Sequence, residues 1–364
     1  MATLTIHTGR IIDNITRLES YLSRQNVQWT LVTKMLCGYR PILEKVLAAP
    51  VIRRLHSIAD SRISNLRMIK SLHPDLLTMY IKPPALEQAA NVVRYADISL
   101  NTSLKTLEIL NEEARRQERT HRVIVMIELG ELREGINREN VLEFYERAFS
   151  FSHIRVNGIG TNLGCMYGVE PTYDKLIQLS LFKQLIEQKF QQKLDLLSGG
   201  SSITLPILPR KKVPRDVNHF RIGETAFLGR ALDSGKRFLN LSTAAFDFSG
   251  EIIELKTKDS IPDGTLSEAS VGQVAEQPAE TAADTPTRRA ERCILDFGEL
   301  DVDVHGLKPK DPGIRFVGTT SDMTVYEVTK ERHQYRVGRR LHFEPNYIAI
   351  ARLMNSRYMT KTVV

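Results

Sequence analysis

A lysine and a series of polar loops are the residues of this chain best suited to chemistry. Lys34 stands directly after a short apolar run, residues 29–32, and opens the segment 34–39. The amine of a lysine at the end of a strand can lose its proton and condense with an aldehyde when its surroundings favour the neutral form. An exposed loop lysine is the ordinary alternative, so the spacing of the residues downstream decides between the two interpretations.

Polar or glycine-rich segments follow six of the strands that we expect. In chain order they are Lys34, 60–62, 128–135, 160–165, 198–202 and 221–224. Each has an ordinary explanation by itself, because glycine and serine make turns and a loop arginine reaches solvent. In barrel enzymes, however, the catalytic groups lie on the loops at the carboxyl ends of the strands. The joint placement of these segments therefore indicates one functional face.

The elements that would position these loops alternate between short apolar runs and amphipathic stretches. Expected strands are 30–33, 55–58, 77–80, 97–100, 122–128, 154–160, 194–197 and 219–222. Expected helices are 41–48, taken as the first, then 63–72, 85–94, 104–117, 138–149 and 173–190. Eight strands at this spacing predict a closed (β/α)8 TIM-type barrel. A doubly wound open sheet is the rival, but it usually has a glycine-rich dinucleotide turn where Lys34 stands.

The sequence changes character after residue 230. Residues 246–256 alternate like a strand, and 293–297, 314–318, 324–329 and 339–343 read as short strands. We therefore expect a barrel at 8–232 and a β-rich domain formed by 1–7 and 233–364. Residues 259–292 are rich in Ala, Glu, Thr, Pro and Ser, which indicates a mobile insertion.

The loops after the last two barrel strands have the composition of a phosphate site. Barrels often bind phosphate there through backbone N–H groups and small hydroxyls. Ser201, Ser202, Gly223 and Glu224 stand in these loops. Ser202 can donate its hydroxyl, and Glu224 would act through its N–H because its carboxylate repels a phosphate. A lysine that binds an aldehyde, together with a phosphate site, specifies pyridoxal 5′-phosphate as the cofactor.

The ordered motifs resemble the alanine/ornithine racemase family. They are Lys34-Met-Leu-Cys-Gly38, Asp60-Ser-Arg-Ile-Ser-Asn65, Glu128-Leu-Gly-Glu-Leu-Arg-Glu-Gly135, Gly160-Thr-Asn-Leu163, Ser198-Gly-Gly200 and Arg221-Ile-Gly-Glu224. The resemblance spans nearly the whole chain and includes Leu300-Asp-Val-Asp303, Ser321-Asp322 and Asn346-Tyr347. It implies an amino-acid racemase (an isomerase) that depends on pyridoxal phosphate and combines an alanine-racemase-like barrel with a β domain. It also implies a homodimer whose sites the partner's β domain completes.

The resemblance further implies a role for each site residue. Lys34 would bind the cofactor and act as the base on one face of Cα. Arg221 would lie against the pyridine nitrogen, and because a guanidinium keeps its proton, the ring would remain a weak electron sink suited to racemisation. Arg133 would lie near the ring hydroxyl or the substrate carboxylate, and Asn162 beside the ring face. Tyr347 would close over the phosphate, the alternative being a core tyrosine.

One catalytic residue of the wider fold has no counterpart in this sequence. Alanine racemases carry a tyrosine from the partner's β domain as the second base, but the corresponding stretch here, 264–273, contains no tyrosine. A racemase needs acid–base groups on both faces of Cα. Asp301, Asp303, Cys165 and Glu268 remain open as candidates for the second group.

The implied substrates are amino acids of the ornithine, lysine and alanine class, interconverted between L and D forms. A side-chain ammonium would need a carboxylate, for which Glu131, Glu134, Asp301 and Asp303 are available. Two other functions fit part of the pattern. A non-catalytic pyridoxal-phosphate homeostasis protein would lack the second base, but such proteins have no β domain. A decarboxylase or lyase on the same fold would set a carboxylate where Arg221 stands.

Composition argues against several other classes. The net charge of +7 is scattered over 364 residues without interleaved aromatic residues, so we expect no nucleic-acid partner. No apolar stretch approaches the ~18 residues of a membrane span, so we expect no membrane partner. The nine histidines lack ligand spacing, so we expect no metal. Three cysteines without paired spacing favour a reducing compartment, the cytoplasm.

Overall fold

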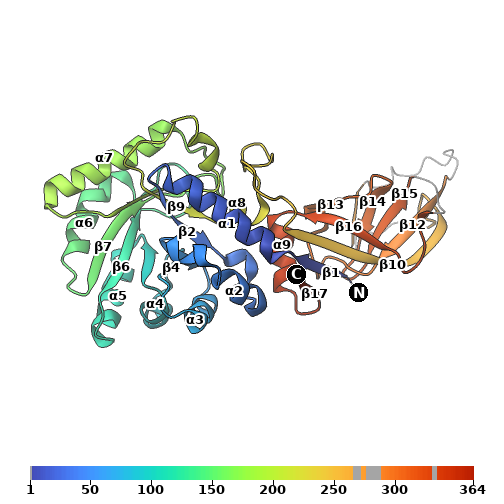
Figure 1. Ribbon diagram of the computed structural model, residues 1–364, viewed down its shortest axis with the longest axis horizontal. Helices are drawn as coiled ribbons and strands as arrows, with labels where there is room; N and C mark the ends of the chain where they lie inside the picture. The colour runs from blue at the N-terminus through green and yellow to red at the C-terminus, as the bar shows by residue number, and fades with distance from the viewer. Residues whose placement is uncertain (1, 265–271, 276–287, 330–333) are drawn as a thin grey trace. The chain divides into compact units, whose positions relative to one another are not determined.

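The computed structural model describes the chain except for residues 1, 265–271, 276–287 and 330–333 (Figure 1). The described residues form two compact units. One consists of Met1–His7 with Ala244–Val364, and the other of Thr8–Thr243.

The larger unit is a closed barrel of eight strands, which confirms the predicted fold class. Its strands are β2 (Gln28–Val32), β3 (Ser57–Asp60), β4 (Thr78–Tyr80), β5 (Ile98–Asn101), β6 (His121–Met126), β7 (Ile154–Gly160), β8 (Leu196–Ser201) and β9 (His219–Ile222). All neighbouring pairs are parallel, and β2 pairs with β9 to close the ring, with Thr30 opposite Arg221. All eight carboxyl ends therefore lie at one mouth of the barrel.

Helices surround these strands (Figure 1). They are α1 (Thr8–Ser23), α2 (Arg40–Leu47), α3 (Ile63–Leu72), α4 (Ala89–Tyr95), α5 (Leu104–Arg116), α6 (Val141–Phe149), α7 (Tyr173–Phe190) and α8 (Glu224–Leu228). Short 3-10 turns lie at η1 (Lys34–Leu36), η2 (Pro50–Arg54), η3 (Leu86–Gln88), η4 (Arg138–Asn140) and η5 (Leu205–Ile207).

The first helix was not predicted, since the sequence analysis placed the first one at 41–48. Helix α1 buries Ile11, Ile15, Leu18 and Leu22 along one face, the spacing of an amphipathic helix. Its Asn14 side chain exchanges two hydrogen bonds with the backbone of Ser242, 2.9 Å to the carbonyl and 2.6 Å from the N–H. This contact ties the start of the barrel unit to its end.

The barrel interior is apolar at its centre. The cluster there consists of Val32, Ala59, Met79, Ile98, Leu100, Ile124, Met126 and Leu196. Side chains from the strands fill the interior of a barrel of this size. This packed centre holds the strands rigidly, so the loops at their carboxyl ends are placed by a stiff support.

The smaller unit is built on one nine-stranded sheet. Its strands are β1 (Thr3–Ile6), β10 (Phe246–Asp259), β11 (Gln273–Val274), β12 (Arg289–Leu295), β13 (Leu307–Pro309), β14 (Ile314–Thr319), β15 (Thr324–Val328), β16 (Arg340–Pro345) and β17 (Thr360–Val363). It also contains η6 (Val304–Gly306) and α9 (Tyr347–Asn355). Phe248, Phe297, Tyr326 and Phe343 stack edge to face or tilted in its core.

The prediction of a mobile insertion at 259–292 is wrong at both ends of this segment. Asp259 is the last residue of β10 and pairs with Arg289, the first residue of β12. Gln273–Val274 within the segment also forms a strand, which pairs with β14. Residues 265–271 and 276–287 lie outside the described part. In the described part of the chain, no helix is long and apolar enough to cross a membrane.

Candidate active site

Lys34 is the first residue of η1, directly after β2, and its side chain is exposed at the barrel mouth. The residue before it is fixed: Thr33 N donates to Ala59 O at 2.8 Å, and Thr33 Oγ1 donates to Asp60 Oδ2 at 3.1 Å. Burial raises the pKa of Glu224, and the Lys34 ammonium opposes this effect. The charge of Lys34 therefore acts on the start of α8, where the phosphate site is expected.

Asp60 anchors the loops on either side of it. Its carboxylate is fully buried and accepts from Arg62 N at 3.0 Å and from Asn65 Nδ2 at 3.1 Å. Burial raises the pKa of Asp60 to about 6, although its hydrogen bonds oppose the rise. Gly38 has φ of +70°, and a Cβ there would lie 2.5 Å from Asn65 Oδ1. Only glycine fits this position, which packs the Lys34 loop against the Asp60 network.

Arg221 is buried at the end of β9 and makes three hydrogen bonds. Its Nε donates to Ser198 Oγ at 3.1 Å, Nη1 to Asn162 Oδ1 at 2.8 Å and Nη2 to Thr161 O at 2.6 Å. Burial lowers the pKa of Arg221 to about 10, and the charge of Glu134 opposes this. A guanidinium has five N–H donors, so two remain without an acceptor among the described residues.

Asn162 and Arg133 are joined through one carboxylate. Asn162 Nδ2 donates to Glu134 Oε1, and Arg133 donates to the same carboxylate through Nε and, at 2.5 Å, through Nη2. Arg133 is thus paired with its neighbour in sequence and is exposed on the loop after β6. The structure brings Arg133, Asn162 and Arg221 together in one hydrogen-bonded chain, with Glu134 as the link that sequence analysis had assigned only to a substrate ammonium.

Glu131 binds backbone N–H groups, whereas sequence analysis considered it as a partner for a substrate ammonium. Its carboxylate is 2% exposed and accepts from the backbone N–H groups of Cys165 (2.9 Å), Tyr167 (2.7 Å), Gly168 (3.2 Å) and Val169 (3.1 Å). Burial acts to raise the pKa of Glu131, but the four N–H groups outweigh it and the net shift is downward. Glu131 therefore holds the loop after β7 and is not available to a substrate ammonium.

The segment 198–202 is placed differently from the expectation. Strand β8 continues to Ser201, so Ser198 and the two glycines lie in a buried strand rather than in a loop. A Cβ at Gly200 would lie 2.1 Å from the Phe220 ring, which explains why no side chain is found there. The turn begins only at Ser201, whose N–H donates to Thr204 Oγ1 at 3.1 Å.

The candidate phosphate site is formed after β8 and β9. Ser202 is buried, and its Oγ accepts from Thr225 N at 3.3 Å, so its own proton can be donated. Gly223 precedes α8, and a Cβ there would lie 2.9 Å from Val32 O. Glu224 is the first residue of α8 and is half-buried. The four predicted residues thus bring N–H and hydroxyl donors together beside β2, the strand that leads to Lys34.

The remaining candidates belong to the smaller unit, except for Cys165. Tyr347 is half-buried at the start of α9 and is not among the residues that the barrel unit brings together. Asp303 Oδ1 caps η6 through His305 N at 3.2 Å. Asp301 Oδ2 accepts from Gly298 N at 3.3 Å, and burial raises the pKa of Asp301. Glu268 lies outside the described residues.

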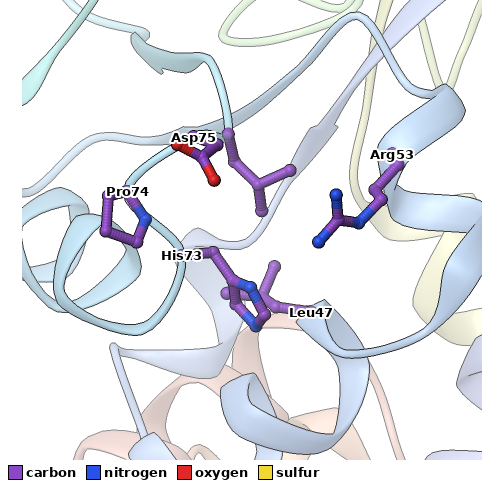
Figure 2. Close-up of a pocket in the computed structure, with 6 residues that line it drawn as sticks. Leu47, Arg53, His73, Pro74 and Asp75 are labelled. Carbon is purple, nitrogen blue, oxygen red and sulfur yellow. The ribbon is translucent and has the colours of Figure 1, made fainter.

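The barrel unit also contains a separate pocket of about 250 Å³, whose lining residues are shown in Figure 2. It is lined by Leu47, Arg53, His73, Pro74, Asp75 and Leu76. These residues lie on the segments that lead into the amino ends of β3 and β4. The pocket therefore does not belong to the mouth where Lys34 and Arg221 lie.

Comparison with known proteins decides the family. Residues 6–231 match the family described as "Alanine racemase, N-terminal domain". The chain belongs to the alanine racemase family. It is 31% identical to an ornithine racemase of Acetoanaerobium sticklandii over 362 residues, 99% of either chain. It is 28% identical to a lysine racemase of Thermotoga maritima over 358 residues, 98% of this chain and 97% of that one.

A solved structure agrees with this assignment. The alanine racemase of Streptomyces lavendulae superposes with a TM-score of 0.74 at 13% identity, covering 100% of this chain and 97% of the other. At that identity the likeness shows the fold alone. The full-length matches to racemases identify this member of the alanine racemase family as an amino-acid racemase.

The residues at the mouth fit the family's usual cofactor. Arg221 is a buried cation with two N–H donors left over and no direct carboxylate partner among the described residues. A neutral ring nitrogen is a suitable acceptor for such a donor. Ser202 and the tight backbone at Gly223 suit a phosphate, and Lys34 supplies the amine.

Proposed function

We propose that this enzyme racemises a basic amino acid, ornithine or lysine, with pyridoxal 5′-phosphate bound at the barrel mouth. The substrate proposal is supported by the two full-length relatives, whose names specify ornithine and lysine. The cofactor proposal is supported by the fit of Lys34, Ser202, Gly223 and Arg221 to its aldehyde, phosphate and ring nitrogen.

Pyridoxal phosphate supplies an aldehyde that binds the substrate amine and a ring that draws electrons from Cα, so that the Cα proton becomes acidic. Lys34 would hold the aldehyde before substrate arrives and then take up the Cα proton on its own face at Nζ. Ser202, with the N–H groups of Gly223 and Glu224, would hold the phosphate. Tyr347 and Ser201 remain proposed cofactor contacts.

Arg221 would donate its two spare N–H groups to the ring side of the site. Even with its pKa lowered to about 10, the guanidinium remains charged at neutral pH, so it donates hydrogen bonds but no proton. The Glu134–Asn162 link balances this charge without placing a carboxylate on Arg221. Arg133 would meet the substrate carboxylate from the rim.

The candidates for the second acid–base group are still Cys165, Asp301, Asp303 and Glu268, of which Glu268 lies outside the described residues. Cys165 is the candidate in the barrel unit. Asp301 or Asp303 would come from a second copy, in the homodimer that the family resemblance implies. We also propose that the enzyme is cytoplasmic, since its three cysteines lack paired spacing and therefore favour a reducing compartment.

The observation that carries the proposal is the pairing of Thr30 with Arg221 in adjacent strands. It puts the amine of Lys34 and the buried cation at the same end of the barrel. The test compares Lys34→Ala with Lys105→Ala, a surface lysine on α5 paired with Glu108. Absorption reports cofactor attachment, and chiral chromatography reports product from L-ornithine, L-lysine and L-alanine.

The native enzyme and Lys105→Ala should show the visible band of lysine-bound cofactor and form D-ornithine or D-lysine faster than D-alanine. Lys34→Ala should lose both band and activity. A band that survives in Lys34→Ala would refute the attachment site. A band without any racemisation would favour a carrier protein, and release of carbon dioxide would favour a decarboxylase.

A further inference from the structure

A chain of hydrogen bonds runs from Arg221 into the barrel core. Arg221 Nε donates to Ser198 Oγ at 3.1 Å, and Ser198 Oγ lies 2.8 Å from His219 Nδ1. His219 Nε2 lies 2.8 Å from Thr30 Oγ1. These residues come from β9, β8 and β2, and Ser198, His219 and Thr30 are completely buried. The chain therefore leads away from the mouth, behind the guanidinium.

The same chain continues toward the opposite face of the barrel. Thr30 Oγ1 lies 2.7 Å from Ser57 Oγ on β3, and Ser57 Oγ lies 3.1 Å from His56 Nδ1. His56 is half-buried, and its ring packs edge to face on that of His219 with centroids 4.9 Å apart. Five of the six members are hydroxyls or imidazoles that can either donate or accept, so their order has to be set from one end.

Arg221 sets that order because a guanidinium can only donate. Ser198 Oγ accepts from Arg221, and its single proton has one further partner among the described residues, His219 Nδ1. His219 Nδ1 then accepts, and its proton must be on Nε2, which donates to Thr30 Oγ1. By the same rule Thr30 donates to Ser57, and Ser57 donates to His56 Nδ1. Each hydroxyl in the chain donates once and accepts from the residue before it.

The two imidazoles are neutral, as this order requires. Burial lowers the pKa of His219 well below its usual value, and the positive charge of Arg221 acts in the same direction. Burial also lowers the pKa of His56 to about 4. A neutral His219 adds no second positive charge behind Arg221, and a charged one would repel it.

We propose that Ser198 and His219 are positioning residues that fix the orientation of Arg221, with the order of the chain holding His219 in the Nε2–H tautomer. Nε and one N–H on each terminal nitrogen are bound by Ser198, Asn162 and Thr161. With these three N–H groups held, the guanidinium plane is fixed, and so are the directions of the two donors that remain. This inference rests on the proposed function for its catalytic consequence, because those donors are the ones assigned to the ring nitrogen.

The barrel contains a matched pair that lacks any bond to Arg221. His121 on β6 is buried and its Nε2 lies 2.7 Å from Ser99 Oγ on β5. Burial lowers the pKa of His121 to about 4, so it too is neutral. Ser99→Ala thus removes a buried hydroxyl bonded to a buried neutral imidazole, as Ser198→Ala does. Both variants lose a hydroxyl that contacts an imidazole. They differ in the second partner of that hydroxyl, since Ser99 Oγ accepts from Asn101 Nδ2 at 2.9 Å and Ser198 Oγ accepts from Arg221 Nε.

The experiment uses full-length holoenzyme of both variants. It measures kcat and KM for the best amino acid, and the dissociation constant for pyridoxal phosphate by dialysis. A hydrogen bond to a charged group is worth about 10- to 100-fold. Ser198→Ala should lower kcat and weaken cofactor binding by about that factor, with KM for the amino acid changed about twofold or less. Ser99→Ala should change all three by about twofold or less.

A second measurement tests the order of the chain without any turnover. Nitrogen-15 spectra of histidine-labelled protein, with the His219 signals assigned by their loss in His219→Gln, report which ring nitrogen carries the proton. The expected result is a protonated Nε2 in the native enzyme. Equal kinetic effects of Ser198→Ala and Ser99→Ala, or a protonated Nδ1 on His219, would overturn the proposal. A native enzyme that neither binds the cofactor nor racemises would instead refute the proposed function, and the tautomer would still decide the order of the chain.

Discussion

Arg221 Nη1 donates a 2.8 Å hydrogen bond to Asn162 Oδ1, while the amide nitrogen of Asn162 donates to Glu134. One neutral amide therefore stands between a buried cation and the nearest carboxylate. A direct ion pair would occupy further N–H donors of the guanidinium, so fewer of them could bind a ligand. The Asn162 amide transmits part of the negative charge of Glu134 to Arg221. Two N–H groups of Arg221 are left over for the proposed site.

Asn162→Asp tests this separation without changing the size of the side chain. The new carboxylate would pair with Arg221 and repel Glu134, so we expect kcat/KM to fall about 10- to 100-fold. The control is Asn140→Asp on the exposed turn before α6, which should match the native enzyme. Unchanged kinetics in Asn162→Asp would show that the amide link has no role.

Glu131→Gln tests the support of the loop after β7. The glutamine amide would direct N–H groups at backbone N–H groups that now donate to a carboxylate, so we expect a loss of about 1–3 kcal/mol in unfolding free energy. Proteolysis within 163–169 should become faster, whereas Glu139→Gln on the surface should change neither property. Since the folded pKa of Glu131 is lowered, its stabilisation is present above the unfolded pKa and is lost as pH falls through the folded value.

Asp60→Asn tests the buried carboxyl beside Thr33. The folded pKa of about 6 lies above the unfolded value of 3.8, so the folded state binds the proton more tightly. Its contribution is therefore present below pH 4 and is lost as pH rises through 6, by about 3 kcal/mol for a shift of two units. Urea unfolding between pH 4 and 7 should show this fall in the native enzyme and in Asp174→Asn, but not in Asp60→Asn. The same slope in Asp60→Asn would assign it to another group.

Gly223→Ala tests the candidate phosphate site. A Cβ there would lie 2.9 Å from Val32 O, so the turn before α8 must move. Overpacking of this kind costs about 1–3 kcal/mol, and if the displaced turn has to be restored to bind phosphate, the dissociation constant for pyridoxal phosphate should rise about 5- to 150-fold. Gly9→Ala meets no atom within 4 Å and should leave cofactor binding unchanged. If the two variants bind the cofactor equally well, the phosphate does not rest on Gly223.

The eight barrel strands were predictable because each is a short buried apolar run bounded by polar residues. The end of β8 was not, because glycine and serine at 198–202 are the residues that also make turns. Ser198 is held in a buried strand by its hydrogen bonds with Arg221 and His219, which are distant in sequence. Helix α1 could have been predicted from the spacing of its buried Ile and Leu residues.

The site was predictable as a set of loops but not as a set of contacts. Lys34, Arg221 and the residues near Ser202 were proposed from their positions at or after the ends of strands, and the fold determines those positions. The pairing of Arg133 with Glu134 and the burial of Glu131 depend on the path of the loop 128–136, where Leu132 and two glycines have positive φ. Sequence patterns do not determine the path of such a loop, so sequence analysis could not assign different roles to Glu131 and Glu134.

Exchange of the Cα proton in deuterium oxide, followed together with chirality, tests the central claim most directly. Native enzyme with pyridoxal phosphate and L-ornithine or L-lysine should incorporate deuterium at Cα and form the D-amino acid, while Lys34→Ala should do neither. Incorporation with complete retention of the L form would mean that Lys34 acts without a group on the opposite face. No incorporation from any amino acid, despite bound cofactor, would contradict the assignment of this site to racemisation.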